Sequence, residues 1–237
     1  MKETLSKLSL VPAAMCFAMC ATALEEKAPV EEPVENPLTC ELLFQFPVLE
    51  REKISDIVLG ADHDPEDRDL FDCLSYDGLS FPHCYDGHDG FDYSLYGGFD
   101  SMDNGSASVV AAASGLIIEV EDGHYDRCHF DLNTLSADCD GHPMIANLVV
   151  IEHPPGPVSY YAHLMKDSIV VFEGQWVEQG DFLGFIGSSG LSSTPHLHFE
   201  TRDANNIPFD PYSGPYSQDK SWWCIQGDTN ELPGECL

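Results

Sequence analysis

Short apolar runs, each bounded by turn-forming residues, dominate the middle of the chain. Five segments are rich in β-branched and aromatic residues and are separated by Gly, Pro, Asn or Asp; they cover residues 108–121, 147–153, 158–164, 168–174 and 181–190. This composition and spacing are typical of β-strands. No segment shows a long 3.6-residue period of the kind that marks an amphipathic helix. The pattern therefore predicts an all-β fold, an antiparallel sandwich or a barrel-like sheet.

The N-terminal segments have a different pattern. Residues 1–23 start with lysines, continue with an apolar stretch and end in the small-residue sequence ATA, as in a cleaved secretory signal peptide. The apolar stretch is too short to span a membrane. Residues 24–39 are acidic and proline-rich, which predicts an extended linker. We therefore expect an exported protein, periplasmic or extracellular, in which order begins near Cys40.

The remaining sequence predicts one domain with two appendages. Residues 40–210 contain the strand-like segments and are expected to form a single domain. Residues 122–146 interrupt the strands with polar residues and two cysteines, which indicates an inserted loop. Residues 211–237 carry two tryptophans and two cysteines, and we expect this C-terminal extension to pack against the domain.

The charge balance narrows the choice of partners. The chain has 10 Lys and Arg against 41 Asp and Glu, a formal net charge of -31. Phosphate backbones and anionic lipids would repel such a chain, so nucleic acid and membrane surfaces are excluded as partners. We expect a monomer with a solvated acidic surface. Calcium sites are the alternative reading of the acidity, although neither of two runs matches a twelve-residue calcium loop; the runs are Asp62, Asp64, Asp67 and Asp69, and Asp131, Asn133, Asp138 and Asp140.

Seven cysteines remain outside the signal segment. In an exported chain they are expected to form disulfides, and near neighbours suggest three pairs, with Cys40 left over. The pairs are Cys73 with Cys84, Cys128 with Cys139, and Cys224 with Cys236. Zinc bound by cysteines is a weaker alternative because the chain contains no C-x-x-C.

Four of the ten histidines have neighbours that suggest chemistry: His88, His163, His196 and His198. His88 and Asp92 stand four residues apart in a glycine-rich stretch, so an imidazole and a carboxylate converge. In the segment PHLHFE, His196 and His198 point to the same face of a predicted strand. One of them would add a third donor, and three protein ligands leave a position open for water, as in a catalytic zinc site. The other histidines are read as surface or core residues; they are His63, His83, His124, His129, His142 and His153.

Three of these segments together resemble a known family. The sequences HDGFD at 88–92, YAHL at 161–164 and GSSGLSSTPHLHFE at 187–200 are similar to the signature segments of lysostaphin and LytM-type zinc metallopeptidases. The similarity covers about residues 81–202 and is specific, because five polar residues match in the family's order. The resemblance implies the family's hybrid β-sheet fold, here with disulfide-stapled loops, and cleavage of peptide bonds in bacterial cell-wall peptidoglycan.

The resemblance also implies roles for individual residues. His88, Asp92 and His198 match the ligands of one Zn²⁺ per chain, whereas His163 and His196 match the catalytic pair that lines the site without binding metal. One departure from the family pattern is Thr194, where relatives commonly have glycine before the proline of the last segment. Two alternatives stay open: an inactive binding or activating module, and an exported peptidase acting on glycine-rich proteins. A lipoyl-type carrier is disfavoured, because it needs an attachment lysine and residues 167–219 contain none.

Overall fold

The structure is a computed structural model and describes residues 42–236, except residues 57, 67, 68, 132, 135, 155, 229 and 230. The predicted signal segment, the linker and Cys40 lie outside the described residues. Among those that are described, no helix is long and apolar enough to cross a membrane.

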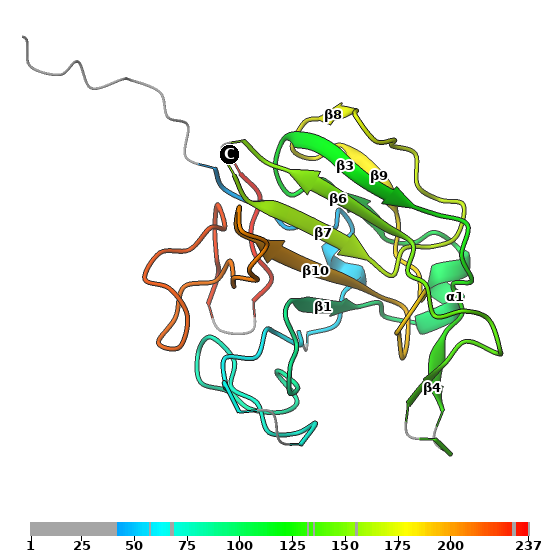
Figure 1. The fold of residues 1–237 in the computed structure, drawn as a ribbon, viewed down its shortest axis with the longest axis horizontal. Helices are drawn as coiled ribbons and strands as arrows, with labels where there is room; N and C mark the ends of the chain where they lie inside the picture. The colour runs from blue at the N-terminus through cyan, green and yellow to red at the C-terminus, as the bar shows by residue number, and fades with distance from the viewer. Residues whose placement is uncertain are drawn as a thin grey trace, which may run out of the picture. The chain divides into compact units, whose positions relative to one another are not determined.

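A six-stranded antiparallel sheet forms the centre of the domain (Figure 1). Burial alternates along the strand at residues 158–162, whereas the strand at residues 148–152 buries three consecutive apolar side chains. In spatial order the strands are β1 (Phe91–Ser94), β10 (His196–Arg202), β7 (Val158–Ala162), β6 (Leu148–Glu152), β3 (Gly115–Glu121) and β8 (Trp176–Val177). The register places Asp92 of β1 opposite His198 of β10, and His198 opposite Ala162 of β7.

Smaller elements surround this sheet. The strands β2 (Ser108–Val110) and β9 (Phe182–Phe185) form a second, two-stranded sheet, and β4 (His129–Asp131) pairs with β5 (Ser136–Asp138) in a hairpin that projects from the body (Figure 1). One short helix, α1 (Gly98–Asp103), and a 3₁₀ turn (Arg51–Lys53) complete the regular structure of the described residues. The prediction of an antiparallel all-β fold is confirmed.

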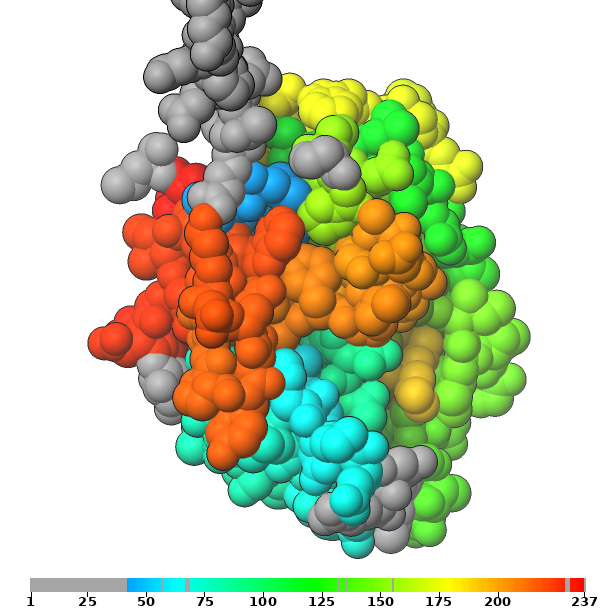
Figure 2. Space-filling model, turned by 60° about the vertical axis from the view of Figure 1, so that its left-hand side comes forward, coloured from blue at the N-terminus to red at the C-terminus, as the bar shows by residue number. Residues whose placement is uncertain are grey.

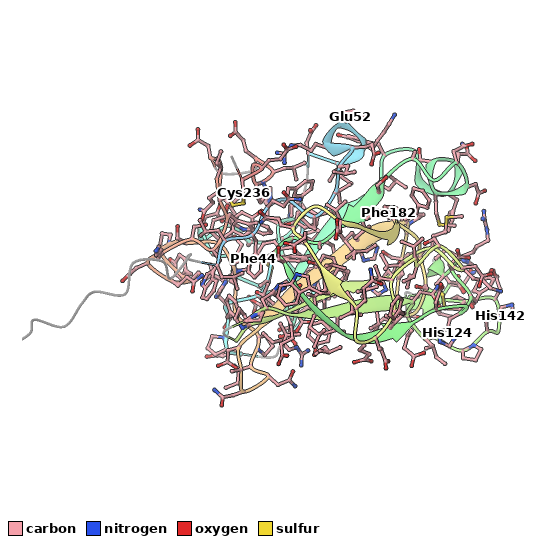
Figure 3. All side chains as sticks on the ribbon, turned by 90° about the horizontal axis from the view of Figure 1, so that it is seen from above. Phe44, Glu52, His124, His142, Phe182 and Cys236 are labelled. Atoms are coloured by element: carbon pink, nitrogen blue, oxygen red, sulfur yellow. A yellow bond between two sulfur atoms is a disulfide. The ribbon has the colours of Figure 1, made fainter. Side chains whose placement is uncertain are left out.

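Strand β10 separates the core from the polar face of the sheet. Leu197 and Phe199 are fully buried on the core side, while His196, His198 and Glu200 alternate with them on the other side. The aromatic part of the core includes Phe44, which lies at the centre of the ribbon in Figure 3 and packs edge-on against Phe199. The period-2 pattern of β10 thus places the polar side chains where they do not disturb the packed core.

Both ends of the described domain meet at this core. Phe44 and Trp223 form a parallel β-bridge, and their ring centroids lie 6.1 Å apart. Trp223 is 3% exposed, so the segment after residue 211 contributes an apolar side chain to the domain interior.

Two predicted strands differ from the structure. Residues 108–121 form two strands, because the small residues Ala111 and Ala112 bond instead to Asp181 O and to the Tyr161 hydroxyl, between the two sheets. Residues 168–174 are not a strand. Val171 is buried in the core, but Val170 and Phe172 are 60% and 66% exposed, and the hydrogen bond from Val170 N to Leu183 O does not extend into a paired strand.

The three suggested disulfides are present in the structure, linking Cys73 to Cys84, Cys128 to Cys139 and Cys224 to Cys236. Two of them close loops beside the polar face of the sheet. The first loop leads into β1, and the second contains the β4–β5 hairpin within the inserted segment 122–146.

Candidate metal centre

Three side chains from two strands and one loop converge on the polar face. His88 precedes β1, Asp92 lies within β1, and His198 lies directly opposite Asp92 on β10. Among the described residues, these three form the one group of His, Cys, Asp or Glu whose donor atoms all lie within 4.8 Å of one another. The register of β1 against β10 therefore brings together residues 106 or more positions apart in the sequence.

The donor atoms form a nearly equilateral triangle. His88 Nε2 lies 3.2 Å from both Asp92 Oδ1 and His198 Nδ1, and His198 Nδ1 lies 2.9 Å from Asp92 Oδ1. Ligands of a tetrahedral zinc ion with bonds of about 2.0–2.1 Å are separated by roughly 3.3 Å. Two imidazole nitrogens and one anionic oxygen at this spacing fit zinc in both chemistry and size.

Acceptors outside the triangle orient both imidazoles. His88 Nδ1–H donates a hydrogen bond to Gly60 O at 2.9 Å, which leaves the Nε2 lone pair facing Asp92. With Nδ1 of His198 facing Asp92, its Nε2–H points to Glu200 Oε2 at 3.4 Å. Arg202 Nε in turn donates to Glu200 Oε1 at 2.6 Å. Such outer contacts fix the tautomer and the ring orientation of a ligand histidine.

Gly90 explains the spacing between His88 and Asp92. A Cβ at this position would lie 2.7 Å from Phe199 O and 2.8 Å from His198 Cε1. Only a residue without a side chain lets the loop cross β10 closely enough for His88 and Asp92 to reach His198.

His163 lies at the end of β7 in a strained backbone conformation. Its φ of 63° is in the left-handed region, which non-glycine residues seldom adopt and which is often retained at functional sites. The ring donates through Nδ1 to Ser189 O at 2.6 Å, so Nε2 is the bare nitrogen. The ring centroid lies 4.6 Å from that of His196 and 5.8 Å from that of His198. The strained turn therefore directs this imidazole toward the triangle.

His196 is held in the same tautomer. Its Nδ1 donates to Thr194 O at 2.7 Å, and its Nε2 lies 3.5 Å from Asp92 Oδ1. The structure thus brings all five sequence-predicted site residues to one place. Thr194 is not among the described residues with positive φ, so a β-branched side chain is compatible with the backbone at this position.

Opposing effects set the charges of the buried groups. Burial raises the pKa of the Asp92 carboxyl, but the neighbouring His88 and His196 and hydrogen bonds from His196 and His198 lower it more, to well below its usual value. Burial, assisted by repulsion from His196 and His198, lowers the pKa of His163 to about 3. At neutral pH Asp92 is therefore an anion, as a metal ligand must be, and His163 is a neutral proton acceptor.

The inserted loop supports the segment whose carbonyl groups bond to His163 and His196. Cys128 N donates to Ser188 O at 2.9 Å, Ser188 Oγ donates to Cys128 O at 2.6 Å, and Phe130 N donates to Ser193 O at 2.9 Å. Residues 188–194 supply Ser189 O to His163 and Thr194 O to His196. The insertion therefore braces the segment that orients these two histidines.

Three site residues were missed by sequence reasoning. Tyr85 stacks on the His88 ring at 4.2 Å, and its hydroxyl donates to Asp92 Oδ2 at 3.4 Å. Glu200 and Arg202 follow His198 at the two-residue period of a strand, which places them on the same face. That period was a usable signal for both of them, whereas nothing in the sequence spacing indicated Tyr85.

The remaining histidines agree with their reading as surface or core residues. His124 and His142 lie at the periphery of the domain in Figure 3. His153 is fully buried, and it bonds to Ser114 O and to the Ser159 hydroxyl. His63 pairs with the buried Asp210 at 2.8 Å. In the space-filling view, atoms of the chain near residues 60 to 75 (cyan) lie beside atoms of the chain near residues 200 to 210 (orange) (Figure 2). The described members of the two aspartate-rich runs form no comparable group of donor atoms. The calcium alternative therefore gains no support from the structure and stays a prediction.

Comparison with known proteins identifies relatives of this arrangement. Peptidase family M23 matches residues 88–211, slightly more than half of the chain. The cell division protein DipM of Caulobacter vibrioides is 39% identical over 74 residues, which cover 29% of this chain and 12% of DipM. The DD-carboxypeptidase/endopeptidase Mpg of Neisseria meningitidis is 45% identical over 67 residues, 28% of this chain and 15% of Mpg. Lysostaphin of Staphylococcus simulans is 30% identical over 111 residues, 47% of this chain and 19% of lysostaphin.

The match is confined to a small part of each relative. The aligned residues span less than a fifth of the length of each of these three curated proteins. Among solved structures, the catalytic domain of lysostaphin from Staphylococcus simulans is 23% identical with a TM-score of 0.35, covering 57% of this chain and 82% of that domain.

Proposed function

The chain belongs to peptidase family M23, and on that premise we propose that it is a zinc-dependent endopeptidase of bacterial cell-wall peptidoglycan that acts outside the cytoplasm. The observation that carries the proposal is the triangle of His88 Nε2, Asp92 Oδ1 and His198 Nδ1, with sides of 2.9–3.2 Å. Relatives named as peptidoglycan or DD-endopeptidases support the substrate class. The sequence pattern of residues 1–23 supports export.

His88, Asp92 and His198 would hold the ion. When bound, zinc supplies a Lewis acid that activates water at neutral pH and polarises a peptide carbonyl. Three protein ligands match a catalytic site, because a structural zinc site closes all four positions with protein donors. Glu200 and Gly60 O keep the two imidazoles turned toward the ion.

His163 and His196 would move protons and stabilise charge. Both rings commit Nδ1–H to a backbone carbonyl, so each presents Nε2 toward the triangle. His163 is neutral, and its Nε2 can take a proton from the attacking water and return it to the leaving amine nitrogen. A protonated His196 beside Asp92 would donate a hydrogen bond to the oxyanion that develops on the scissile carbonyl.

The test combines metal content with turnover. We expect about one zinc per chain by elemental mass spectrometry, and release of cross-link fragments from purified peptidoglycan. Changing His88, Asp92 or His198 to Ala should remove both zinc and activity. His163→Ala and His196→Ala should keep zinc and lose about 10²- to 10⁴-fold in turnover, the usual contribution of a general acid or base.

His142→Ala is the matched control, because this exposed ring stacks on Tyr125 far along the inserted loop. It should leave zinc content and turnover unchanged. Full activity in a chelator-treated, zinc-free sample would end the proposal. Zinc binding without cleavage of any peptidoglycan would instead favour an inactive binding module, and cleavage confined to glycine-rich proteins would change the substrate class.

A further inference from the structure

Arg202 presents a fixed guanidinium group beside the candidate metal centre. It ends β10, four residues beyond His198 and on the same face. Its Nε donates to Glu200 Oε1 at 2.6 Å, and its Cζ lies 5.0 Å from the ring centroid of Tyr160. An ion pair on one edge and an aromatic ring beneath the plane restrict the guanidinium to one orientation.

The strand register locates this group relative to the triangle. Glu200 lies opposite Tyr160 on β7, and His198 lies opposite Ala162. The guanidinium lies over Tyr160 and contacts Glu200. It is therefore level with the Glu200–Tyr160 pair, which is the next pair on this face after His198–Ala162. Rows on one face are two residues, or about 7 Å, apart. An extended peptide along β10 would reach Arg202 about two residues from a bond held at the triangle.

The guanidinium keeps donors available on this face. Nε is its one nitrogen with a protein acceptor in the described part of the chain, which leaves the N–H groups of Nη1 and Nη2. The side chain is 25% exposed, so these groups are open to a ligand. The hydrogen bond to Glu200 raises the pKa of Arg202 above its usual value, and its charge is therefore permanent.

Other described basic side chains near the sheet do not offer the same arrangement. Arg127 pairs with the Asp103 carboxylate, and Arg51 bonds to the carbonyls of Leu232 and Pro233. Arg202 is thus a preorganised cation next to a peptidase site in a chain of net charge -31. A guanidinium with two free N–H donors matches a carboxylate bidentately.

We propose that Arg202 is a specificity determinant that binds a carboxylate of the substrate peptide, placed about two residues from the scissile bond. The proposal rests on the proposed peptidase function and names a feature of its substrate. Long-range repulsion by the acidic surface does not oppose it strongly, because salt screens charges beyond about 8 Å at physiological ionic strength, whereas the guanidinium and carboxylate are in contact.

The experiment compares paired synthetic cross-linked peptides that carry either a carboxylate or a carboxamide two residues from the scissile bond, on either side. For the zinc-loaded wild-type protein, kcat/KM should be about 10- to 100-fold higher for the carboxylate peptide, the range of charge-assisted hydrogen bonds. In Arg202→Gln the ratio should fall to about 1, with zinc content and melting temperature retained. Arg202→Lys should give an intermediate ratio, since lysine keeps the charge but loses the bidentate geometry.

A binding measurement separates this inference from catalysis. Dissociation constants for the same peptides with a reduced, uncleavable scissile bond should show the same preference and its loss in Arg202→Gln. Arg127→Gln is the matched control, because it removes a surface guanidinium paired with Asp103 and should leave the ratio unchanged.

Each outcome decides the question. Equal kcat/KM and equal binding of the two peptides by the wild type would overturn the inference, as would a preference that survives in Arg202→Gln. If Arg202→Gln loses zinc and weakens both peptides equally, the residue acts through Glu200 alone and the inference is wrong. If the peptides bind with the expected preference and none is cleaved, the inference stands and the proposed peptidase function fails.

Discussion

Glu200→Gln and Glu200→Ala should lower zinc affinity in two graded steps. The Glu200 carboxylate accepts a hydrogen bond from His198 Nε2 at 3.4 Å, and its side chain is 9% exposed. Burial raises the pKa of this carboxyl, but hydrogen bonds from His198 and Arg202 lower it more, so the group is anionic. An anionic acceptor makes the ligand imidazole a better donor to a metal and fixes its direction.

The geometry sets the size of each step. Outer partners of ligand histidines contribute about 10- to 100-fold in metal affinity. Glutamine keeps an oxygen for His198 but removes the charge, and the 3.4 Å contact is long for a hydrogen bond. We therefore expect about a tenfold loss in Glu200→Gln, roughly 1.4 kcal/mol. Alanine removes acceptor and charge together, and we expect about a hundredfold loss.

The assay is a competition for zinc between the protein and a chelating dye of known affinity at neutral pH. Glu152→Gln is the matched control, because Glu152 is an exposed carboxylate on β6 of the same sheet. Melting temperatures of the zinc-free proteins show whether a variant has lost its fold. A zinc affinity of Glu200→Ala within twofold of the wild type would refute the orienting role of this carboxylate.

Three further perturbations test other parts of the structure. Gly90→Ala should lower zinc affinity at least tenfold in the same competition, because its Cβ would lie 2.8 Å from His198 Cε1; unchanged affinity would show that the loop has room for a side chain. Burial lowers the pKa of His153 to about 4. As pH falls, the unfolded chain therefore protonates this imidazole at a higher pH than the folded chain does. The free energy of unfolding should fall by about 3 kcal/mol between pH values of about 6.5 and 4. Urea unfolding of His153→Gln should not show this loss of stability at low pH. If His153→Gln and the wild type have the same pH dependence, His153 is not the group responsible. Combining Cys128→Ser with Cys139→Ser opens a ring of sequence separation 11, which should cost about 3 kcal/mol and lower turnover while zinc content is retained; turnover equal to that of the wild type would exclude a supporting role for the loop.

The strands were predictable where an apolar run is buried and pairs with a neighbour. Residues 147–153 and 158–164 read as strands and form β6 and β7, because the two pair with each other and bury side chains, alternately in β7 and at three consecutive positions in β6. Residues 168–174 have the same composition and bury Val171, but they do not pair as a strand. Composition alone does not report whether a partner strand is available, so this prediction was wrong.

The donor set was predictable from segment signatures, and its surroundings were not. The five site residues followed from three short motifs and the two-residue period of β10. Gly60 O and Ser189 O are backbone acceptors, and any residue type supplies such an atom. Their roles depend on where the loops pass in space, which sequence spacing does not encode. Tyr85 belongs to the same class, because its contact with Asp92 depends on the path of the chain that follows Cys84 and the first disulfide.

The short span of the three disulfides has a consequence for how the molecule is assembled. Each joins cysteines only 11 or 12 positions apart, and none ties one strand of the central sheet to another. Every ring can close as soon as its own segment is available, so correct oxidation requires no search among distant partners. Reducing agents should accordingly loosen the loops beside the polar face first and leave the hydrogen-bonded central sheet in place.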